Sequence, residues 1–375
     1  MGVDVSVVLP CQNEEKSVGL CIKAIKDVMS ELKYSYEIIV SDSSSDKSPT
    51  IAKKLGAKVV KHDLDGYGNA LLQGFRKAKG NIIIMADADN TYNFYEIPKF
   101  LEAIKDSDMV IGSRFKGDIK KGAMPFFHKY LGNPLLSFIL RLFFHTSISD
   151  SHSGFRAINK EELEELELKT TGMEFASEMI MKALKNNLRI KEIPITYHKR
   201  KGTSKMKSFK DGWKHLRFML LYSPTYLYIV PGFLLFFLGL LLMILLLPGE
   251  VTINNFNFDI HFLVLGSFLA LLGFQVLMLG LYSKVYAKIT GFEKENKILD
   301  KIAEFFPLER SLLIGLAFFI IGLVVVLKIF FFWISEGFPG IFEVRNIIFG
   351  LTLALIGIQV IFSSFFTSLL LIDRK

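Results

Sequence analysis

The stretch Ile82-Ile83-Ile84-Met85-Ala86-Asp87-Ala88-Asp89-Asn90 runs from large apolar residues directly into two carboxylates. An unbroken apolar run of this length predicts a strand that is buried on both faces, as in parallel sheets. The carboxyl ends of such strands face the ligand crevice of an open α/β sheet. Asp87 and Asp89 are therefore placed where both can reach one hard cation, which prefers oxygen ligands. The alternative is an acidic turn that caps the next helix.

Short strands alternate with helices on both sides of this stretch. The expected strands cover residues 5–10, 37–40, 58–60, 82–86 and 108–111. This alternation predicts a doubly wound α/β domain with a largely parallel sheet. From about residue 116 to residue 222 the pattern is less regular. It predicts a partly helical apolar segment, two further helices and one strand, at 126–144, 161–167, 174–185 and 190–197 respectively.

The second half of the chain is much more apolar than the first. The chain has 375 residues, enough for two domains, and its mean hydropathy is +0.36. Four segments, at about 226–247, 261–283, 312–334 and 347–372, contain long apolar runs. Since a bilayer core needs roughly 20 apolar residues per helix, each is long enough to cross a membrane. We expect a domain over 1–206, an interfacial segment over 207–225 and a membrane domain over 226–375.

The positive charge of the chain, +8 in total, is concentrated just before the first apolar segment. Residues 199–217 hold eight Lys or Arg and one acid, Asp211. A basic stripe is typical of nucleic-acid, anionic-lipid or phosphate binding, and its position here favours a cytoplasmic membrane surface over nucleic acid. Residues 207–221 also space Trp213, Leu216 and Leu220 as an amphipathic interfacial helix does.

The loops between the apolar segments predict the topology. Residues 248–260 have no Lys or Arg, residues 284–311 have six, and residues 335–346 have only Arg345. The positive-inside rule then places the first domain and both termini in the cytoplasm of a multi-pass cell-membrane protein. No signal peptide is expected, since Asp4 interrupts the first apolar stretch. Cys11 and Cys21 are expected to be reduced packing residues.

Two other stretches carry candidate ligand-binding residues. Asp42 ends the second strand, where it can accept hydrogen bonds from a base or a ribose, or cap the helix that follows. Gly66-Tyr67-Gly68-Asn69-Ala70 turns into a helix N-terminus, which can host an anion. Ordinary turn chemistry explains the same glycines.

Several motifs follow one another in a fixed order: Ser6-Val7-Val8-Leu9-Pro10, Asn13-Glu14-Glu15, Asp42-Ser43-Ser44-Ser45-Asp46, Gly66-Tyr67-Gly68-Asn69-Ala70 with Gly74, Asp87-Ala88-Asp89 and Gly112-Ser113-Arg114-Phe115. In this order they resemble the family 2 glycosyltransferases with the GT-A fold. Two more narrow the resemblance to the branch that moves a sugar onto a polyprenyl phosphate, as dolichol-phosphate mannose synthases do. These are Asp150…Ser153-Gly154-Phe155-Arg156 and Arg200-Lys201-Gly202-Thr203-Ser204-Lys205. The resemblance covers about residues 3–222.

The resemblance implies roles for the residues on the donor side. Pro10 and Glu14 would frame the nucleotide pocket, and Asp42 would contact the nucleobase or ribose. Asp87 and Asp89 would hold Mg²⁺ or Mn²⁺ on the diphosphate of a UDP- or GDP-linked sugar.

Two departures concern this side. Ser41 stands where the family usually has the first of two acids, and Thr91 stands where it usually has Gln, which puts a third metal ligand in doubt.

The resemblance also implies how a polyprenyl or dolichyl phosphate is held. Arg114 would approach the acceptor phosphate together with either His128 or Lys129, between which the residues do not choose. Arg200 and Lys205 would lie on a loop that closes over donor and acceptor phosphates. The Gln-x-x-Arg-Trp motif of processive synthases is absent from the sequence, which argues against a polysaccharide polymerase.

A phosphate acceptor changes what the protein must supply. A phosphate monoester, with its second pKa near ~6, is mostly dianionic at neutral pH and needs no protein base. Glu178 is the fallback base, and a solvated helix acid is the plainer interpretation. The resemblance implies a direct displacement that inverts the anomeric carbon.

Two other functions remain open at this point. One is a glycosyltransferase that acts on another lipid, such as diacylglycerol, in glycolipid synthesis. The other is a membrane scaffold or transporter with a non-catalytic nucleotide domain. A homo-oligomer is compatible with each of these functions.

Overall fold

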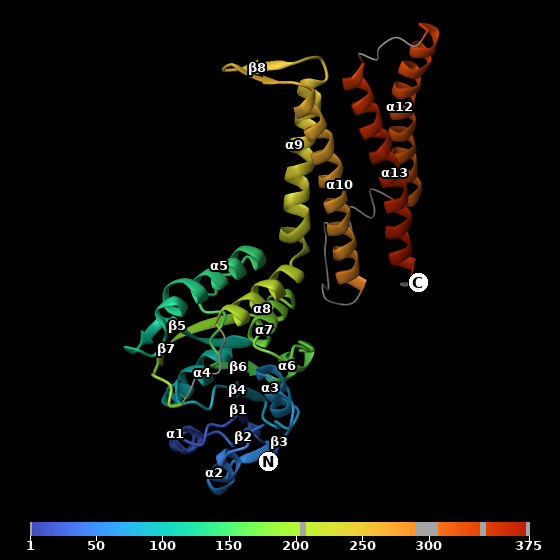
Figure 1. Ribbon diagram of the computed structural model, residues 1–375. Helices are drawn as coiled ribbons and strands as arrows, with labels where there is room; N and C mark the ends of the chain where they lie inside the picture. The colour runs from blue at the N-terminus through green and yellow to red at the C-terminus, as the bar shows by residue number, and fades with distance from the viewer. Residues whose placement is uncertain (1, 203–207, 290–306, 338–342, 373–375) are drawn as a thin grey trace. The chain divides into compact units, whose positions relative to one another are not determined.

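The computed structural model of the chain describes residues 2–202, 208–289, 307–337 and 343–372. The chain divides into two units, Met1–Met219 and Leu220–Lys375. The first unit contains the α/β sheet and the second contains the long apolar helices (Figure 1).

The first unit is built on a mostly parallel sheet that has seven strands within the described residues. Their order is β3-β2-β1-β4-β6-β5-β7, and only β6 runs antiparallel to its neighbours. This confirms the predicted largely parallel sheet. The strands are β1 (Val5–Cys11), β2 (Tyr36–Asp42), β3 (Lys58–Lys61), β4 (Ile82–Met85), β5 (Met109–Ile119), β6 (Arg156–Asn159) and β7 (Ile190–Tyr197).

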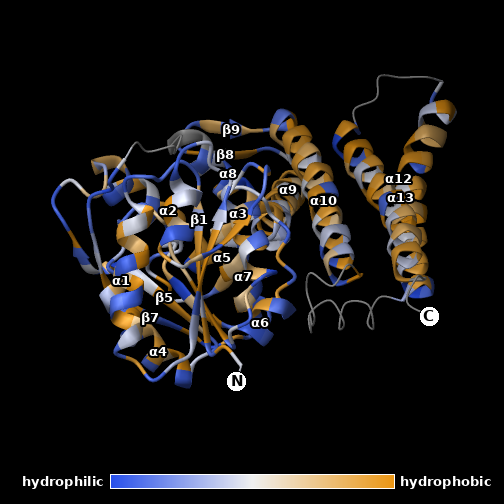
Figure 2. Ribbon diagram, turned by 90° about the horizontal axis from the view of Figure 1, so that it is seen from below, coloured by the Kyte–Doolittle hydropathy of each residue, from blue (hydrophilic) through white to orange (hydrophobic). Residues whose placement is uncertain are grey.

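Helices cover both faces of this sheet (Figure 2). Along β1, Val7 and Leu9 join the apolar core that includes α1, whereas Val8 points to the other face and lies against α3 at Gly74. A side chain at Gly74 would overlap Val8, so this glycine lets α3 approach the sheet closely. The helices are α1 (Val18–Ser30), α2 (Ser48–Lys54), α3 (Tyr67–Phe75), α4 (Ile97–Ala103), α5 (Asn133–Phe144), α6 (Lys160–Glu165), α7 (Phe175–Lys185) and α8 (Ser208–Leu221), with short turns η1 (Phe94–Glu96), η2 (Ile104–Asp106) and η3 (His128–Gly132).

Strand β4 brings the acidic stretch to the carboxyl edge of the sheet. It pairs in parallel with β1, with Ile82 opposite Val5 and Met85 opposite Val8. Ile84 and Met85 are fully buried, as the unbroken apolar run predicts. The strand ends at Met85, so Asp87 and Asp89 lie in the turn that follows it.

Four helices of the second unit are long and apolar enough to cross a membrane, counted over the described residues. They span Thr225–Leu246 (η4, Thr225–Ile229, with α9, Val230–Leu246), Ile260–Ile289 (α10), Leu308–Ser335 (α12) and Val344–Leu371, the last within α13 (Val344–Ile372). Their positions agree with the four predicted segments. A short hairpin, β8 (Val251–Ile253) and β9 (Phe256–Phe258), joins the first two.

Glycines let these helices pack in pairs. A side chain at Gly239 of α9 would overlap the backbone of Gly266 and Ala270 in α10. In the same way, a side chain at Gly322 of α12 would overlap Gly350 in α13. Small residues at such contacts allow close van der Waals packing between membrane helices. Ser267 of α10 and Thr352 of α13 add a hydroxyl contact of 2.6 Å between the two pairs.

Candidate functional site

The two carboxylates after β4 have different surroundings. Asp89 is 6% exposed, and its Oδ1 accepts hydrogen bonds from the backbone N–H (3.0 Å) and the hydroxyl (2.6 Å) of Thr91. Burial and the negative charge of Asp89 raise the pKa of Asp87, and Arg200 opposes this shift. A site that makes ionisation of Asp87 costly favours the approach of a cation.

Arg200 already supplies positive charge here. It follows β7, and its Nη1 lies 3.3 Å from Oδ2 of Asp89 while its Nη2 donates to Glu14. The backbone N–H of Lys201 also donates to the carbonyl of Asp89 at 3.2 Å. The structure thus brings together Glu14, Asp89 and Arg200, which lie far apart in the sequence. Lys205, predicted on the same loop, lies outside the described residues.

Asp42 is fully buried at the end of β2. In the register of β1 and β2 it lies opposite Cys11, the last residue of β1, and Ser41 lies opposite Pro10. Neither oxygen of its carboxylate accepts a hydrogen bond within the described part of the chain, and the hydroxyl of Ser41 is also unpaired. Lys61 lies 3.5 Å from Oδ2 of Asp42. Asp42 does not cap the helix that follows, since α2 begins at Ser48 and is flanked by Lys47. A buried carboxylate whose oxygens accept no hydrogen bond suits a ligand that carries N–H or O–H groups.

The glycine turn before α3 packs against protein rather than presenting free N–H groups. The N–H groups of Gly68 and Asn69 donate to the carbonyls of Gly172 (3.2 Å) and Thr171 (3.1 Å). A side chain at Gly66 or Gly68 would overlap backbone oxygens of the same 170–171 segment. Close packing therefore explains these glycines, and the predicted anion site at this helix start is not supported.

Gly154 is a constrained position beneath Asp87. Its N–H donates to the hydroxyl of Tyr92 at 2.7 Å. A Cβ on Gly154 would lie 2.9 Å from the hydroxyl of Tyr67 and 3.2 Å from both carboxylate oxygens of Asp87. Tyr67 in turn donates a hydrogen bond to Asp87. Glycine here leaves room for the Asp87 carboxylate.

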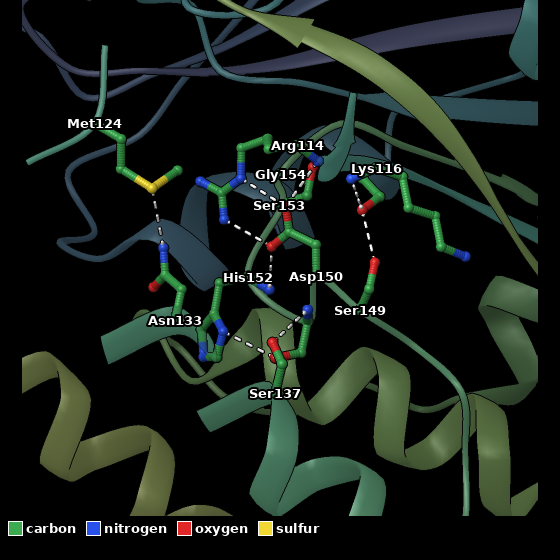
Figure 3. A network of polar contacts seen from close by, with 12 residues as sticks. Arg114, Lys116, Met124, Asn133, Ser137, Ser149, Asp150, His152, Ser153 and Gly154 are labelled. Carbon is green, nitrogen blue, oxygen red and sulfur yellow. Dashed lines mark hydrogen bonds and ion pairs between the residues drawn. The ribbon is translucent and has the colours of Figure 1, made fainter. Parts of the chain in front are cut away.

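Arg114, in the middle of β5, forms a buried ion pair with Asp150 (Figure 3). Nε of Arg114 donates to Oδ2 of Asp150 at 2.7 Å, and Nη2 donates to Oδ1 at 2.8 Å. Arg114 is 7% exposed, and its guanidinium lies 5.2 Å from the centre of the Tyr197 ring. This bidentate geometry fixes the plane of the guanidinium, which leaves Nη1 as the nitrogen not used by Asp150.

The 149–156 segment is held from several sides. Glu192 of β7 accepts hydrogen bonds from the N–H groups of Ser149 (2.8 Å) and Asp150 (3.1 Å). The fully buried Arg156 donates to the carbonyls of Ser151, Ser153 and Ala176. Ser137 of α5 contacts the Ser151 hydroxyl at 3.0 Å. These contacts hold Asp150 in place, and Asp150 in turn fixes the guanidinium of Arg114.

The two alternatives for a second acceptor-binding residue differ in their surroundings. Burial, and to a smaller extent the positive charge of Arg114, lower the pKa of His128. Lys129 instead lies over the ring of Tyr130, with 5.4 Å between Nζ and the ring centre. Both residues belong to η3.

Two histidines join the 149–156 segment to α8. The rings of His152 and His215 meet edge to face with their centres 4.4 Å apart. Nδ1 of His152 contacts the hydroxyl of Ser151, and Nδ1 of His215 contacts that of Ser177, both at 2.8 Å. Burial lowers the pKa of both rings, and that of His215 falls to about 4. Both rings are therefore neutral at pH 7.

Glu178 is not the solvated acid that the sequence suggested. It is fully buried on α7, where its carboxylate accepts hydrogen bonds from the N–H groups of Lys169 and Thr170 and from the Thr170 hydroxyl. Lys182 lies 2.9 Å from its Oε1. Glu178 thus fixes the 169–171 segment, which packs on Gly66 and Gly68. All the hydrogen bonds to its carboxylate come from the protein itself, as is typical of a structural residue.

The described residues contain no cluster of three or more His, Cys, Asp or Glu that could hold a metal ion. Asp87 and Asp89 would supply two carboxylate ligands to a divalent cation. Thr91 is not placed as a third ligand, because its hydroxyl donates to Asp89. Hard cations often keep water and take the remaining ligands from substrate phosphates. The pair therefore suits a metal that arrives with a diphosphate.

Glu178→Gln is expected to reduce stability rather than to remove a catalytic base. The amide loses the charge that Lys182 and the 169–170 donors compensate, which costs about 1–3 kcal/mol for a buried charged hydrogen-bond acceptor. The matched change Glu102→Gln, at an exposed acid of α4, should leave the unfolding free energy unchanged. Thermal unfolding of both variants, with turnover per folded molecule, measures this. Normal stability with lost turnover would contradict the structural role.

Stability of the first unit is expected to fall as the pH drops from 6.5 toward 4. The unfolded chain takes up a proton at His215 in this range, whereas the folded chain, with a pKa of about 4, does not. The contribution of His215 amounts to about 3 kcal/mol, and His215→Gln should remove it and make the pH profile shallower, while the contribution of the buried His152 remains. The charged groups around the ring are Asp211, Lys214 and Arg156. Trp213 fluorescence in a Trp333→Phe background follows unfolding; an unchanged profile in His215→Gln would contradict this.

Residues 6–167 match the family model for glycosyl transferase family 2, and residues 281–371 match the model for the family 2 C-terminal transmembrane region. A solved structure of glucosyl-3-phosphoglycerate synthase from Mycobacterium tuberculosis, with Mn²⁺, UDP and its product, is 21% identical. It aligns over 58% of this chain and 79% of its own, with a TM-score of 0.47.

Two proteins of Haloferax volcanii are similar in sequence. The low-salt glycan biosynthesis hexosyltransferase Agl6 is 40% identical over 96% of this chain and 87% of its own length. A dolichyl-phosphate hexose transferase is 30% identical over 56% of this chain and 89% of its own length. The resemblance inferred from the motifs is thereby confirmed: the chain belongs to glycosyltransferase family 2, with a GT-A domain followed by the family's C-terminal transmembrane region.

Proposed function

We propose that the protein transfers a hexose from a nucleotide-diphosphate sugar to a polyprenyl or dolichyl phosphate at the cytoplasmic face of the membrane. The observation that carries this proposal is the pair Asp87 and Asp89 at the end of β4, with Arg200 bridging Asp89 to Glu14. The similarity to a hexosyltransferase and to a dolichyl-phosphate hexose transferase supports the choice of sugar and acceptor.

The donor nucleotide would lie along the ends of β1 and β2. The oxygens of the buried Asp42, which accept no hydrogen bond from the described residues, could accept from N–H or O–H groups of a base or ribose. Pro10 is the last but one residue of the neighbouring strand β1, and Glu14 lies in the segment between β1 and α1. The diphosphate would then reach the carboxylates after β4.

Asp87 and Asp89 would hold Mg²⁺ or Mn²⁺, which when bound neutralises charge on the leaving diphosphate. Thr91 holds one oxygen of Asp89, so the other oxygen keeps a fixed direction. Arg200, now paired with Asp89 and Glu14, would donate hydrogen bonds to the phosphates. Lys205 would belong to the same phosphate-binding loop.

The acceptor phosphate would approach through Arg114. Asp150 fixes the guanidinium plane by two hydrogen bonds, and the remaining nitrogen, Nη1, is the one that would donate to the phosphate. Burial and the charge of Arg114 lower the pKa of His128, which favours the neutral imidazole as a hydrogen-bond donor, whereas Lys129 lies over Tyr130. We therefore assign the second acceptor contact to His128.

These groups orient the nucleophile and do not activate it. A phosphate monoester is already dianionic at neutral pH, because its second pKa is about 6. The buried Glu178 is saturated by donors of its own fold and is not needed as a base. The phosphate oxygen would attack the anomeric carbon as the nucleotide diphosphate leaves, which inverts that centre.

The membrane unit would keep the active site at the depth of the acceptor headgroup. The six Lys or Arg in 284–311 and the absence of any from 248–260 support a cytoplasmic first unit and cytoplasmic termini. Helix α8, with Trp213 56% exposed, would lie at the interface. Association of several chains is compatible with this arrangement.

Transfer to an uncharged lipid such as diacylglycerol is the second candidate function. It would need the same carboxylate pair but no site for a phosphate dianion. The buried Arg114, which is held in one orientation by Asp150, favours the phosphate acceptor.

Asp89→Asn is expected to abolish Mn²⁺-dependent binding of UDP or GDP. Loss of a supporting residue around a metal ligand costs about 10–100-fold in affinity, and loss of a ligand charge should cost at least as much. Calorimetry on the purified full-length protein measures this for both nucleotides. Asp118→Asn, at an exposed carboxylate on β5, is the matched control and should bind as the wild type does. Unaltered metal-dependent binding by Asp89→Asn would contradict the proposed site.

His128→Gln is expected to raise the KM for a short polyprenyl phosphate about 5-fold, the equivalent of one hydrogen bond worth about 1 kcal/mol. The KM for the nucleotide sugar should not change, since His128 lies on the acceptor side. Lys129→Gln, one residue along η3, should leave both values near those of the wild type. Equal effects of the two substitutions, or an effect on the donor KM alone, would contradict the assignment.

A further inference from the structure

The hairpin between α9 and α10 has an apolar face that the protein leaves largely uncovered. In its register Val251 lies opposite Phe258, and Ile253 lies opposite Phe256. Because alternate residues of a strand point to the same side, these four side chains share one face of the hairpin. Ile253 is 55% exposed and Phe256 is 74% exposed. The half of the apolar face nearest the turn is therefore open.

The other face of the hairpin is polar. Thr252 and Asn257 lie opposite each other there, and the Thr252 hydroxyl donates a hydrogen bond to Oδ1 of Asn257 at 2.6 Å. Asn254 and Asn255 form the turn with φ values of 46° and 66°, as a two-residue type I′ turn requires. Such a turn fixes the register of the strands, and with it the division into an apolar and a polar face.

The base of the hairpin is fixed to the long helices. The ring of Phe258 lies 4.7 Å from the ring of Phe262 in the first turn of α10. Asp259, directly after β9, accepts a hydrogen bond from Nη2 of Arg345 in α13. A Cβ on Gly249, before β8, would lie 3.4 Å from Nη1 of the same arginine. The hairpin therefore projects from a held base, to the side of the ends of α9 and α10 (Figure 1).

A hairpin with three residues in each strand needs something to cover its apolar face. Isolated two-stranded hairpins are at most marginally stable in water. Within the described ranges, no element covers Ile253 or Phe256, which stay exposed. The two strands form a sheet of their own, so each also keeps one edge of N–H and C=O groups that needs water. The hairpin therefore suits a boundary between an apolar layer and water.

The neighbouring elements identify this boundary as the surface of a bilayer. The hairpin lies between two helices that are long and apolar enough to cross a membrane, since α9 ends at Leu246 and α10 begins at Ile260. Its apolar face is thus continuous with apolar spans on both sides. A second copy of this chain is a poorer occupant, because two exposed side chains bury far less than the ~1,000 Å² that a stable protein interface needs.

We propose that residues 251–258 lie in the plane of the bilayer surface, on the side opposite the first unit. The apolar face enters the boundary between headgroups and acyl chains, and the face with Thr252 and Asn257 meets water. One crossing, in α9, separates the hairpin from the first unit, which puts the two at opposite surfaces. The hairpin thereby holds the far ends of α9 and α10 at a fixed depth. This role is independent of the donor and of the acceptor.

The charge of the hairpin region sets the kind of lipid dependence that we expect. Residues 248–260 hold no Lys or Arg and two acids, Glu250 and Asp259. Attraction to anionic headgroups therefore does not contribute, and burial of apolar side chains has to hold the hairpin at the surface.

Spin labelling of the full-length protein tests this placement. Nitroxides on Phe256→Cys and on Asn257→Cys, neighbours that point to opposite faces, are measured in phosphatidylcholine nanodiscs. The native Cys11 and Cys21 are buried and serve as the unlabelled background. The ratio of collisions with oxygen to collisions with a water-soluble nickel chelate should be several-fold higher at position 256 than at 257. Addition of phosphatidylglycerol should leave this difference unchanged.

A second pair of labels on β8 keeps the test independent of one variant. Ile253→Cys should give the high ratio of position 256, and Thr252→Cys the low ratio of position 257. Equal ratios on the two faces would overturn the proposal, whether all are low, as on an aqueous hairpin, or all high. Protection of positions 253 and 256 from both colliders would show that protein covers the apolar face, and would also overturn it.

Discussion

The bridge that Arg200 makes between Glu14 and Asp89 holds the candidate site together. It joins the loop after β7 to the ends of β1 and β4, three segments that meet because the sheet places them at one edge. Without a cation, the carboxylates of Asp87 and Asp89 would carry a costly buried charge. The same need for positive charge makes this edge suitable for a metal ion, which could in turn bind a diphosphate.

A second buried ion pair organises the other half of the site. Asp150 fixes Arg114, and the 149–156 segment that carries Asp150 is tied to β7 by Glu192 and to α7 by Arg156. Gly154 of the same segment packs beneath Asp87. The residues proposed for the donor and those proposed for the acceptor are therefore connected through the 149–156 segment.

Local patterns in the sequence were sufficient to predict the parallel strands, the position of Asp87 and Asp89, and the four long apolar helices. Strand β6 was missed because Arg156–Asn159 has only four residues and no alternation. The Arg114–Asp150 pair and the burial of Glu178 depend on long-range packing, which no local pattern reports. The sequence predicted a partly helical apolar segment at 126–144 but not that Leu135, Phe138 and Leu142 of α5 are half exposed, because hydrophobic periodicity does not show which face of a helix meets the core.

Product analysis in proteoliposomes tests the central claim most directly. The purified protein would be given UDP- and GDP-linked hexoses with Mg²⁺ or Mn²⁺, and would be offered a short polyprenyl phosphate and diacylglycerol in equal amounts. The account predicts metal-dependent formation of a polyprenyl-phosphate-linked hexose with inverted anomeric configuration. A glycosylated diacylglycerol as the sole product, or no transfer to the polyprenyl phosphate from any donor, would contradict it.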